Sequence, residues 1–218
     1  PVHLEKLGYQ KDIDWVEFEL KVPESIPEKL ERINEIVLKR SKLRILDVKK
    51  PKEFLPYAEG IFELMEEAYK DLYGAVPLNE KQVESYIKQY FGFVNPNFVK
   101  IILDNDDKIA AFGITMPSLS TALQKTGGRL FPFGFISILK SIKKNDRLDL
   151  YLVAVRPDLQ GKGVTALLLT EINKAAIKYG IKYAETGPEL EDNSKVQALW
   201  KFFEVRQHKR RRCFIKEL

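Results

Sequence analysis

The chain of 218 residues has little cysteine and histidine: one Cys (Cys213) and two His (His3 and His208). A single cysteine excludes an internal disulfide framework, and so few Cys and His side chains leave almost no ligands for a zinc site. No run reaches the roughly 18–20 apolar residues that a membrane-spanning helix needs. Nothing at the start resembles a signal peptide, so we expect a reducing, cytoplasmic setting, no metal and no membrane partner.

The composition is that of an ordinary globular protein, with 44% hydrophobic and 31% charged residues. These values exclude disordered, collagen-like and low-complexity classes. The length suits one large domain, or one domain with an additional fragment, and is ample for a hydrophobic core.

The formal net charge of +5 is concentrated near the end of the chain. Residues 201–218 contain seven basic and two acidic side chains, whereas the other 200 residues contain 29 of each sign. The basic run His208–Arg212 has three interpretations: a solvated edge strand protected by charge, a contact with an anionic ligand, or a nucleic-acid contact. Because basic residues are not spread over the sequence, nucleic-acid binding is the least favoured.

Hydrophobic periodicity predicts the elements of the first half of the chain. In chain order we expect a helix end and a strand within 1–22, an amphipathic helix after Pro27, a strand at 43–49, a helix from Pro51 to about Tyr73, a helix from Asn79 to Phe91, and a hairpin of strands 98–103 and 108–115.

Residues 117–145 form an insertion that contains the apolar stretch LFPFGFISIL. Ten residues are too few to cross a bilayer. We therefore predict a buried helix or a lid over a pocket, with membrane contact as a minor alternative.

The second half predicts a strand at 148–155, a helix from Val164 to about Tyr179, a strand at 181–186, a helix within 189–203 and a closing strand at 210–218. A hairpin followed by this alternation indicates a mixed α/β (α+β) sheet in one domain.

The loop GKG at 161–163 lies between a buried strand and a helix. Free N–H groups at a helix start, the helix dipole and glycines that permit close approach favour anion binding there. Alternatively, Gly161 and Gly163 shape a tight helix entry. A dinucleotide fingerprint is disfavoured because RPDLQ separates the strand from the glycines, and only 33 residues follow Glu185.

The run V-A-V-R-P-D-L-Q-G-K-G-V at 153–164 resembles the cofactor motif Q/R-x-x-G-x-G/A of the GNAT acyltransferase superfamily. The resemblance covers about residues 43–218. It implies a mixed, mostly antiparallel sheet flanked by helices, in which the fourth and fifth strands splay apart to admit the pantetheine arm of acetyl-coenzyme A or a related acyl-coenzyme A.

The same resemblance implies a set of cofactor-binding residues. Val153 and Val155 would pair with the pantetheine amides, and Asn193 matches an Asn of the family, with helix N-capping as the alternative role. The final small position of the motif is Thr165, a departure that either adds a hydroxyl for phosphate or crowds the site. Backbone N–H groups would hold the pyrophosphate at Gln160, Gly161, Lys162, Gly163, Val164 and Thr165.

The expected reaction is direct acyl transfer to a primary amine of a small molecule or peptide, since Cys213 lies in the basic last strand and does not suit a covalent mechanism. Asp149 occupies the position where some GNAT enzymes carry a catalytic Glu, and an enclosed carboxylate there would have a raised pKa suited to a base. The alternative is an ion pair of Asp149 with Arg147 or Lys182. The Val153 N–H could polarise the thioester oxygen.

Other candidate roles are less constrained. Glu185 could bind the amine or act as a second base, and Tyr69 and Tyr73 could line the acceptor pocket. Trp200 stands where many family members carry a general-acid Tyr, and an indole is no practical acid. Either the thiolate leaves unassisted, or another group such as Tyr151 protonates it, or the chain is a degenerate member that binds an acyl cofactor or a partner protein without turnover.

Both ends of the chain predict a helix end followed by a strand. Gly8 and Tyr9 fit the pattern that closes the family's last helix. Residues 1–23 are therefore interpreted as the tail of a preceding GNAT-like domain or as an N-terminal arm, 24–42 as a linker helix, and 43–218 as the acyltransferase domain. A homodimer is compatible with either interpretation.

Overall fold

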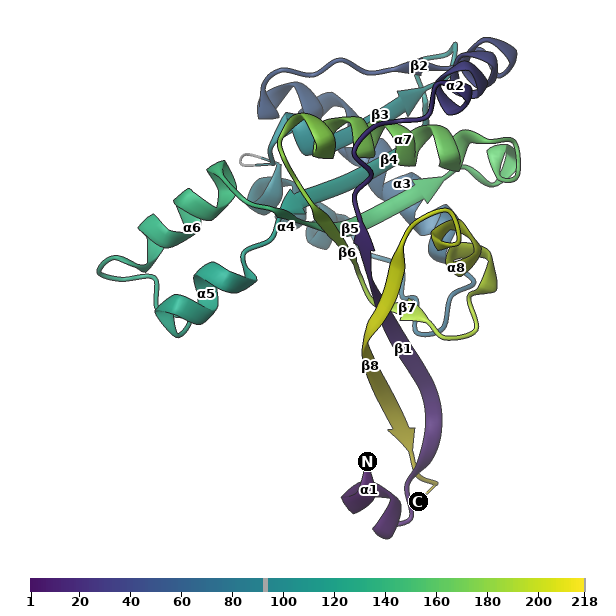
Figure 1. The fold of residues 1–218 in the computed structure, drawn as a ribbon. Coiled ribbons are helices and arrows are strands. Elements are labelled where there is room, and N and C mark those ends of the chain that lie inside the picture. Colours follow the sequence, from purple (N-terminus) through teal and green to yellow (C-terminus); the bar gives the residue numbers. More distant parts are fainter. Residues whose placement is uncertain (92–93, 218) are drawn as a thin grey trace.

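One eight-stranded sheet runs through the computed structural model, which describes residues 1–91 and 94–217 (Figure 1). The expected mixed α/β sheet is confirmed: every neighbouring pair is antiparallel except β5 and β6, which are parallel. The strands follow the order β2 (Arg44–Ile45), β3 (Val99–Leu103), β4 (Ile109–Pro117), β5 (Arg147–Val155), β6 (Tyr183–Thr186), β1 (Gln10–Lys21) and β7 (Glu189–Leu190), with β8 (Val205–Ile215) paired to β1.

Helices cover both faces of the sheet. α7 (Val164–Lys178) connects β5 to β6, as a parallel pair requires, and buries Leu167, Leu168 and Ile172 against one face. On the other face α3 (Ala58–Tyr69) buries Ile61 and Leu64. The core therefore consists of two apolar layers separated by the central strands.

The helix expected from Pro51 to about Tyr73 is shorter and in two parts. Residues Pro51–Tyr57 form a 3₁₀ segment that contains Pro56, and the α-helix begins only at Ala58. Proline inside the segment has no N–H to donate, which disfavours a regular α-helix there. The neighbouring prediction is confirmed: α4 (Glu80–Tyr90) starts at Asn79, whose side chain forms a capping box with Gln82.

The remaining elements follow the predicted order but differ from the predictions in length. The predicted helix within 189–203 is reduced to α8 (Ser194–Trp200), because residues 189–190 pair with Trp15 and Val16 as strand β7. The other helical elements are α1 (Val2–Lys6), α2 (Glu28–Arg40), η2 (Pro96–Phe98) and η3 (Pro157–Leu159).

A lid over a pocket stays a prediction for the insertion at 117–145, but the insertion is not the buried helix that was the other expectation. It forms α5 (Ser120–Thr126) and α6 (Gly134–Lys143), two helices that project from the body as a hairpin (Figure 1). Only Ala122 in α5 and Gly134 in α6 are buried, because no other element packs over the outer faces of the two helices.

Strand β1 lies inside the sheet, although it comes from the first residues of the chain. One edge of β1 pairs with β6 and β7, and the other pairs with β8 from Gln10 to Leu20. The two strands continue beyond the body as a ribbon with both chain ends at its tip (Figure 1). The interpretation of residues 1–23 as the tail of a preceding domain stays a prediction.

The basic run of β8 is neutralised by acidic side chains of β1. Arg210 and Arg212 both contact Asp14, which has no exposed surface, at 2.8 Å. Lys209 lies 3.1 Å from Glu17. The hydrogen bonds from Arg212 and Arg210 lower the pKa of the Asp14 carboxyl. The run therefore has a structural role in pairing β8 with β1, and its contact with an anionic ligand or a nucleic acid stays a prediction.

Candidate functional site

Strands β5 and β6 separate in the middle of the sheet. They are paired from Arg147 to Leu150, and the last bond between them joins the Gly187 N–H to the Leu150 carbonyl at 3.0 Å. In the described part of the chain, β5 continues to Val155 with no further pairing to β6. The strands predicted at 148–155 and 181–186 correspond to β5 and β6, and the expected splay between them is confirmed.

A β-bulge lies at the point of separation. Ile114 of β4 faces Leu152, but its neighbour Thr115 faces Leu150, so Tyr151 is an extra residue on β5. As a result Leu150 and Val153 both pack toward the α7 core, although they are three residues apart. Bulges are frequent beside active sites because they redirect groups at the strand edge. Nothing in the apolar run 148–155 predicted this bulge.

The polar backbone groups of Val153 face the space between the separated strands. The Tyr69 hydroxyl donates to the Val153 carbonyl at 2.9 Å and accepts from the Val153 N–H at 3.3 Å. Burial raises the pKa of this phenol. Tyr69 thus contacts the strand itself, whereas Tyr73, the other residue predicted to line the acceptor pocket, donates to Asp12.

Asp149 lies on β5 just before the bulge, and its register partner on β6 is Glu185. Burial raises the pKa of the Asp149 carboxyl, opposed by a hydrogen bond with Ser118 and increased further by the negative charge of Glu185. Asp149 forms no ion pair with any described residue, so the predicted alternative of a pair with Arg147 or Lys182 is not observed.

Glu185, in contrast, is held by cations. Its carboxylate lies 3.2 Å from the Arg147 guanidinium and 3.1 Å from the Lys209 ammonium, while Arg147 also contacts Glu19 at 2.6 Å. These contacts neutralise Glu185 and fix its side chain. Of the two carboxylates, Asp149 is therefore the one without an ion pair to a described residue, and Lys209 and Arg147 act on its charge only from a longer distance.

The glycine loop leads directly into α7. Gly161 and Gly163 adopt φ angles of 73° and 86°, which L side chains rarely adopt. A Cβ on Gly161 would meet no atom within 4 Å, whereas one on Gly163 would lie 2.9 Å from Val37 of α2. Gly163 therefore also serves packing, and Gly161 leaves open space beside the backbone.

The other predicted loop residues lie around these glycines. The Gln160 amide donates to the Val155 carbonyl at the end of β5, at 3.2 Å. Lys162 is exposed, and α7 begins at Val164 with Thr165 in its first turn. The unpaired N–H groups of that turn point toward the loop, where an anion would be stabilised.

Asn193 lies at the start of α8, apart from the loop. Its side chain accepts from the Val196 N–H at 3.4 Å, the N-capping role that the sequence left open. A contact with a cofactor stays a prediction.

Glu189 is a titratable group that the sequence did not reveal. Trp200, 6% exposed, donates its indole N–H to both carboxylate oxygens of Glu189, at 3.0 and 3.1 Å. Burial raises the pKa of Glu189 to about 7, although hydrogen bonds from Trp200 and Thr186 oppose this shift. Glu189 follows the separation point by two residues. Trp200 lies eleven residues further on, a distance of about 16 Å along a continuous helix, so the helix predicted within 189–203 did not indicate the contact.

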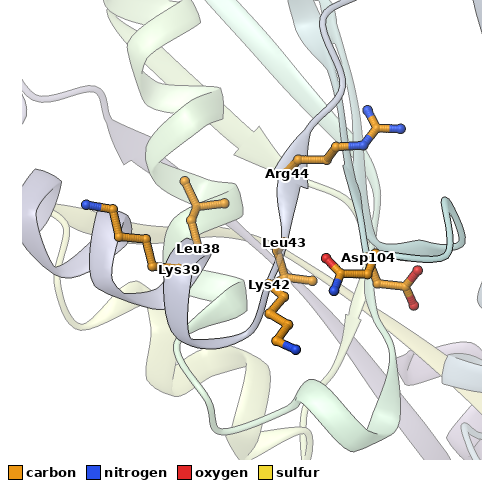
Figure 2. Close-up of a pocket in the computed structure, with 7 residues that line it drawn as sticks. Leu38, Lys39, Lys42, Leu43, Arg44 and Asp104 are labelled. Atoms are coloured by element: carbon orange, nitrogen blue, oxygen red, sulfur yellow. The ribbon is translucent and has the colours of Figure 1, made fainter.

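A solvent-open cavity of about 350 Å³ lies where α2 turns into β2 (Figure 2). Lys39, Lys42 and Arg44 make its lining basic, and Asp104 and Asn105 close its far side. The cavity is near the glycine loop, because Val37 of α2 abuts Gly163 and Asp104 contacts Arg156 at 2.6 Å.

Within residues 1–91 and 94–217, no group of three or more His, Cys, Asp or Glu side chains could hold a metal ion. In the same part of the chain, every helix is too short or too polar to cross a membrane.

Comparison with protein families matches residues 59–203 to the acetyltransferase (GNAT) family. A curated relative, Protein YghO of Escherichia coli, is 22% identical over 223 residues, a match that covers 99% of this chain and 56% of the relative.

Solved structures give the same fold. A GCN5-related N-acetyltransferase from Sphaerobacter thermophilus superposes with a TM-score of 0.60 at 14% identity, over 98% of this chain and 54% of that one. A tandem GNAT protein from the clavulanic acid biosynthesis pathway gives 0.56 at 11% identity, over 98% and 56%. This chain thus spans about half the length of these relatives.

Proposed function

The chain belongs to the acetyltransferase (GNAT) family, and from this premise we propose that it transfers an acetyl or related acyl group from acyl-coenzyme A to a primary amine. The observation that carries the proposal is the position of Val153. Its N–H and C=O are not paired with β6, because Val153 lies just beyond the point where β5 and β6 separate. This leaves an edge to which an extended, amide-containing ligand can bind as a strand does.

The residues present fit an acyl-coenzyme A. Gly161 leaves room beside the backbone at the start of α7, and Lys39 and Lys42 add positive charge near that loop for the phosphates. At Val153 the Tyr69 hydroxyl contacts both backbone groups and must move aside, so that the C=O can accept from a pantetheine amide while the N–H is left for the thioester oxygen. The bound group would supply an acyl thioester, whose carbonyl carbon an amine nitrogen attacks.

The chain's own residues then supply a base and an oxyanion contact. We assign the base to Asp149, which accepts the proton of the amine directly or through one water. Its burial without a cationic partner suits this role, because the raised pKa makes the carboxylate a better base. The Val153 N–H donates to the thioester oxygen as negative charge develops there.

Glu189 is the proposed proton donor in place of the missing tyrosine. With a pKa of about 7, the carboxyl is partly protonated at neutral pH and can deliver its proton to the departing thiolate. Trp200 would act as a positioning residue, since its indole N–H fixes the Glu189 carboxyl.

A second candidate function is binding of an acyl-coenzyme A without turnover. Trp200 at the tyrosine position favours it, and so does the Tyr69 hydroxyl, which competes for the Val153 backbone.

Two measurements test the proposal in sequence. A thermal shift with acetyl-coenzyme A measures binding, and thiol release on addition of a panel of amines and amine-bearing peptides measures transfer. Stabilisation together with thiol release that depends on an amine would support the enzyme. Stabilisation without thiol release would favour the binding function, and no stabilisation by any acyl-coenzyme A would overturn both.

A further inference from the structure

The α5–α6 hairpin, residues 117–145, has few residues covered by other elements. It projects from the body between the end of β4 and the start of β5 (Figure 1). Its base is tied to the sheet: Ser141 and Asn145 donate to the Ser118 carbonyl at 2.9 and 2.5 Å. The hairpin is thus held in place at its base, and its far end faces solvent.

The tip of the hairpin exposes large apolar side chains. Phe131 is 79% exposed and Phe133 is 73% exposed, and Leu130, Phe135 and Leu139 are also exposed. Phe131 and Phe135 lie together, with ring centroids 6.2 Å apart. An apolar patch of this kind on a globular protein marks a surface that contacts a partner or a membrane.

The charge of the hairpin is of one sign. It contains five basic side chains and no Asp or Glu. Within the described residues none of the five forms an ion pair, whereas Arg210 and Arg212 of β8 are neutralised by Asp14. The basic residues of the hairpin are Lys125, Arg129, Lys140, Lys143 and Lys144.

We propose that the α5–α6 hairpin docks on an anionic lipid membrane. Aromatic side chains at the tip would enter the interface, and the basic side chains behind them would contact the headgroups, the arrangement by which amphipathic segments bind membrane surfaces. A second copy of the chain is disfavoured, because it would bring two basic hairpins together. A nucleic acid would satisfy the charge but not the exposed phenylalanines.

This inference stands without the proposed function but has a consequence for it. Ser118 at the base of the hairpin is hydrogen-bonded to Asp149. The ten residues of α6, about 15 Å, separate this base from the tip. A membrane at the tip would therefore lie about that far from the candidate site and would favour acceptors that extend from its surface.

Binding of the full chain to vesicles tests the proposal by sedimentation. We expect binding to vesicles of phosphatidylcholine mixed with phosphatidylglycerol, loss of binding at raised ionic strength, and little binding to phosphatidylcholine alone. The double variant F131A/F133A should bind at least about tenfold more weakly, and so should K140Q/K143Q/K144Q.

Matched variants control for hydrophobicity and charge. Phe202 is 88% exposed and lies outside the hairpin, so F202A should bind like the unchanged chain. K29Q/K81Q/K201Q removes the same charge as the hairpin variant from other exposed positions and should lower binding less. Circular dichroism verifies that each variant is folded.

The proposal would be overturned by no binding to anionic vesicles, by equal loss in the hairpin and control variants, or by a homodimer in sedimentation velocity that F131A/F133A dissociates. Capture of an acidic protein partner by the hairpin in place of vesicles would also overturn it. Neither acetyl-coenzyme A nor turnover enters these measurements, so failure of the membrane proposal is distinguishable from failure of the proposed function.

Discussion

The Tyr69 hydroxyl bridges the N–H and the C=O of Val153, and so satisfies both polar groups of the residue at the centre of the candidate site. The two residues are 84 positions apart in the chain, and the contact joins α3 to the unpaired edge of β5. It gives the first prediction.

Replacing Tyr69 with Phe should lower the stability of the fold and strengthen the binding of acetyl-coenzyme A. Without the hydroxyl, the Val153 N–H and C=O lose their partner, and the free energy of unfolding should fall by about 1–3 kcal/mol. Acetyl-coenzyme A no longer competes with the hydroxyl, so its Kd should decrease. Urea denaturation and calorimetric titration measure the two effects. Y86F is the control, since Tyr86 stacks on Phe62 away from Val153; a higher Kd for Y69F would show instead that the hydroxyl helps to hold the ligand.

Replacing Asp149 with Asn should remove the base and leave cofactor affinity unchanged. We expect kcat to fall by about 10²–10⁴-fold. In the unchanged chain, kcat/KM should rise with pH as Asp149 loses its proton, at a pH above the usual range of an aspartate because burial raises its pKa. This limb of the pH profile should vanish in D149N and persist in D146N, which alters an exposed residue of the preceding loop. Turnover that survives in D149N would exclude Asp149 as the base.

Glu189 should make stability depend on pH. Its pKa is about 7 in the folded chain against 4.5 for the ordinary group, so the folded state binds more protons between these values. Its contribution to stability is therefore lost as pH rises from about 4.5 to 7.

The variant E189Q lacks this titration while keeping an oxygen for the Trp200 indole. The free energy of unfolding of E189Q, taken relative to that of the unchanged chain, should be larger at pH 8 than at pH 5. The expected difference is on the order of 1–2 kcal/mol, after allowance for solvent screening of a partly exposed group. Urea denaturation at the two pH values measures this difference. E191Q provides the contrast, because ion pairs with Lys11 and Arg210 lower the pKa of Glu191. Equal pH dependence in E189Q and the unchanged chain would refute the assignment.

A pair of glycine variants tests the phosphate loop. Gly161 and Gly180 have φ angles of 73° and 72°, and a Cβ on either would meet no atom within 4 Å. G161A and G180A should therefore lose similar stability, about 1–2 kcal/mol each, from the left-handed backbone alone.

Only G161A should weaken the binding of acetyl-coenzyme A, because Gly180 follows the far end of α7. Titration calorimetry with both variants checks this. Unchanged affinity in G161A would remove the loop from the binding site.

Local chemistry in the sequence was sufficient to predict several elements correctly. Asn79 and Gln82 supply a capping box from side chains three residues apart, so the start of α4 was predictable. The turn at 104–107 between β3 and β4 was likewise predictable, as was the order of strands and helices from β5 onward. The motif at 153–164 and its position between a strand and a helix identified the family before any contact was known.

The sequence could not show which distant groups meet. Strand β1 enters the sheet between β6 and β8, and its acids form ion pairs with the basic run, for which the sequence had left three interpretations open. Likewise, no local pattern showed that Arg147 contacts Glu185 and Glu19 and forms no ion pair with Asp149.

The sequence by itself thus determined the fold class and the position of the glycine loop, because capping, periodicity and glycine conformations depend on residues close in the chain. Only the tertiary structure decided the contacts around the candidate site and the exposure of the α5–α6 hairpin: these contacts are the bulge at Tyr151, the Tyr69 hydroxyl on Val153 and the Trp200 indole on Glu189. Burial, pairing and pKa depend on neighbours that the fold brings together from far along the chain, and so no local pattern encodes them.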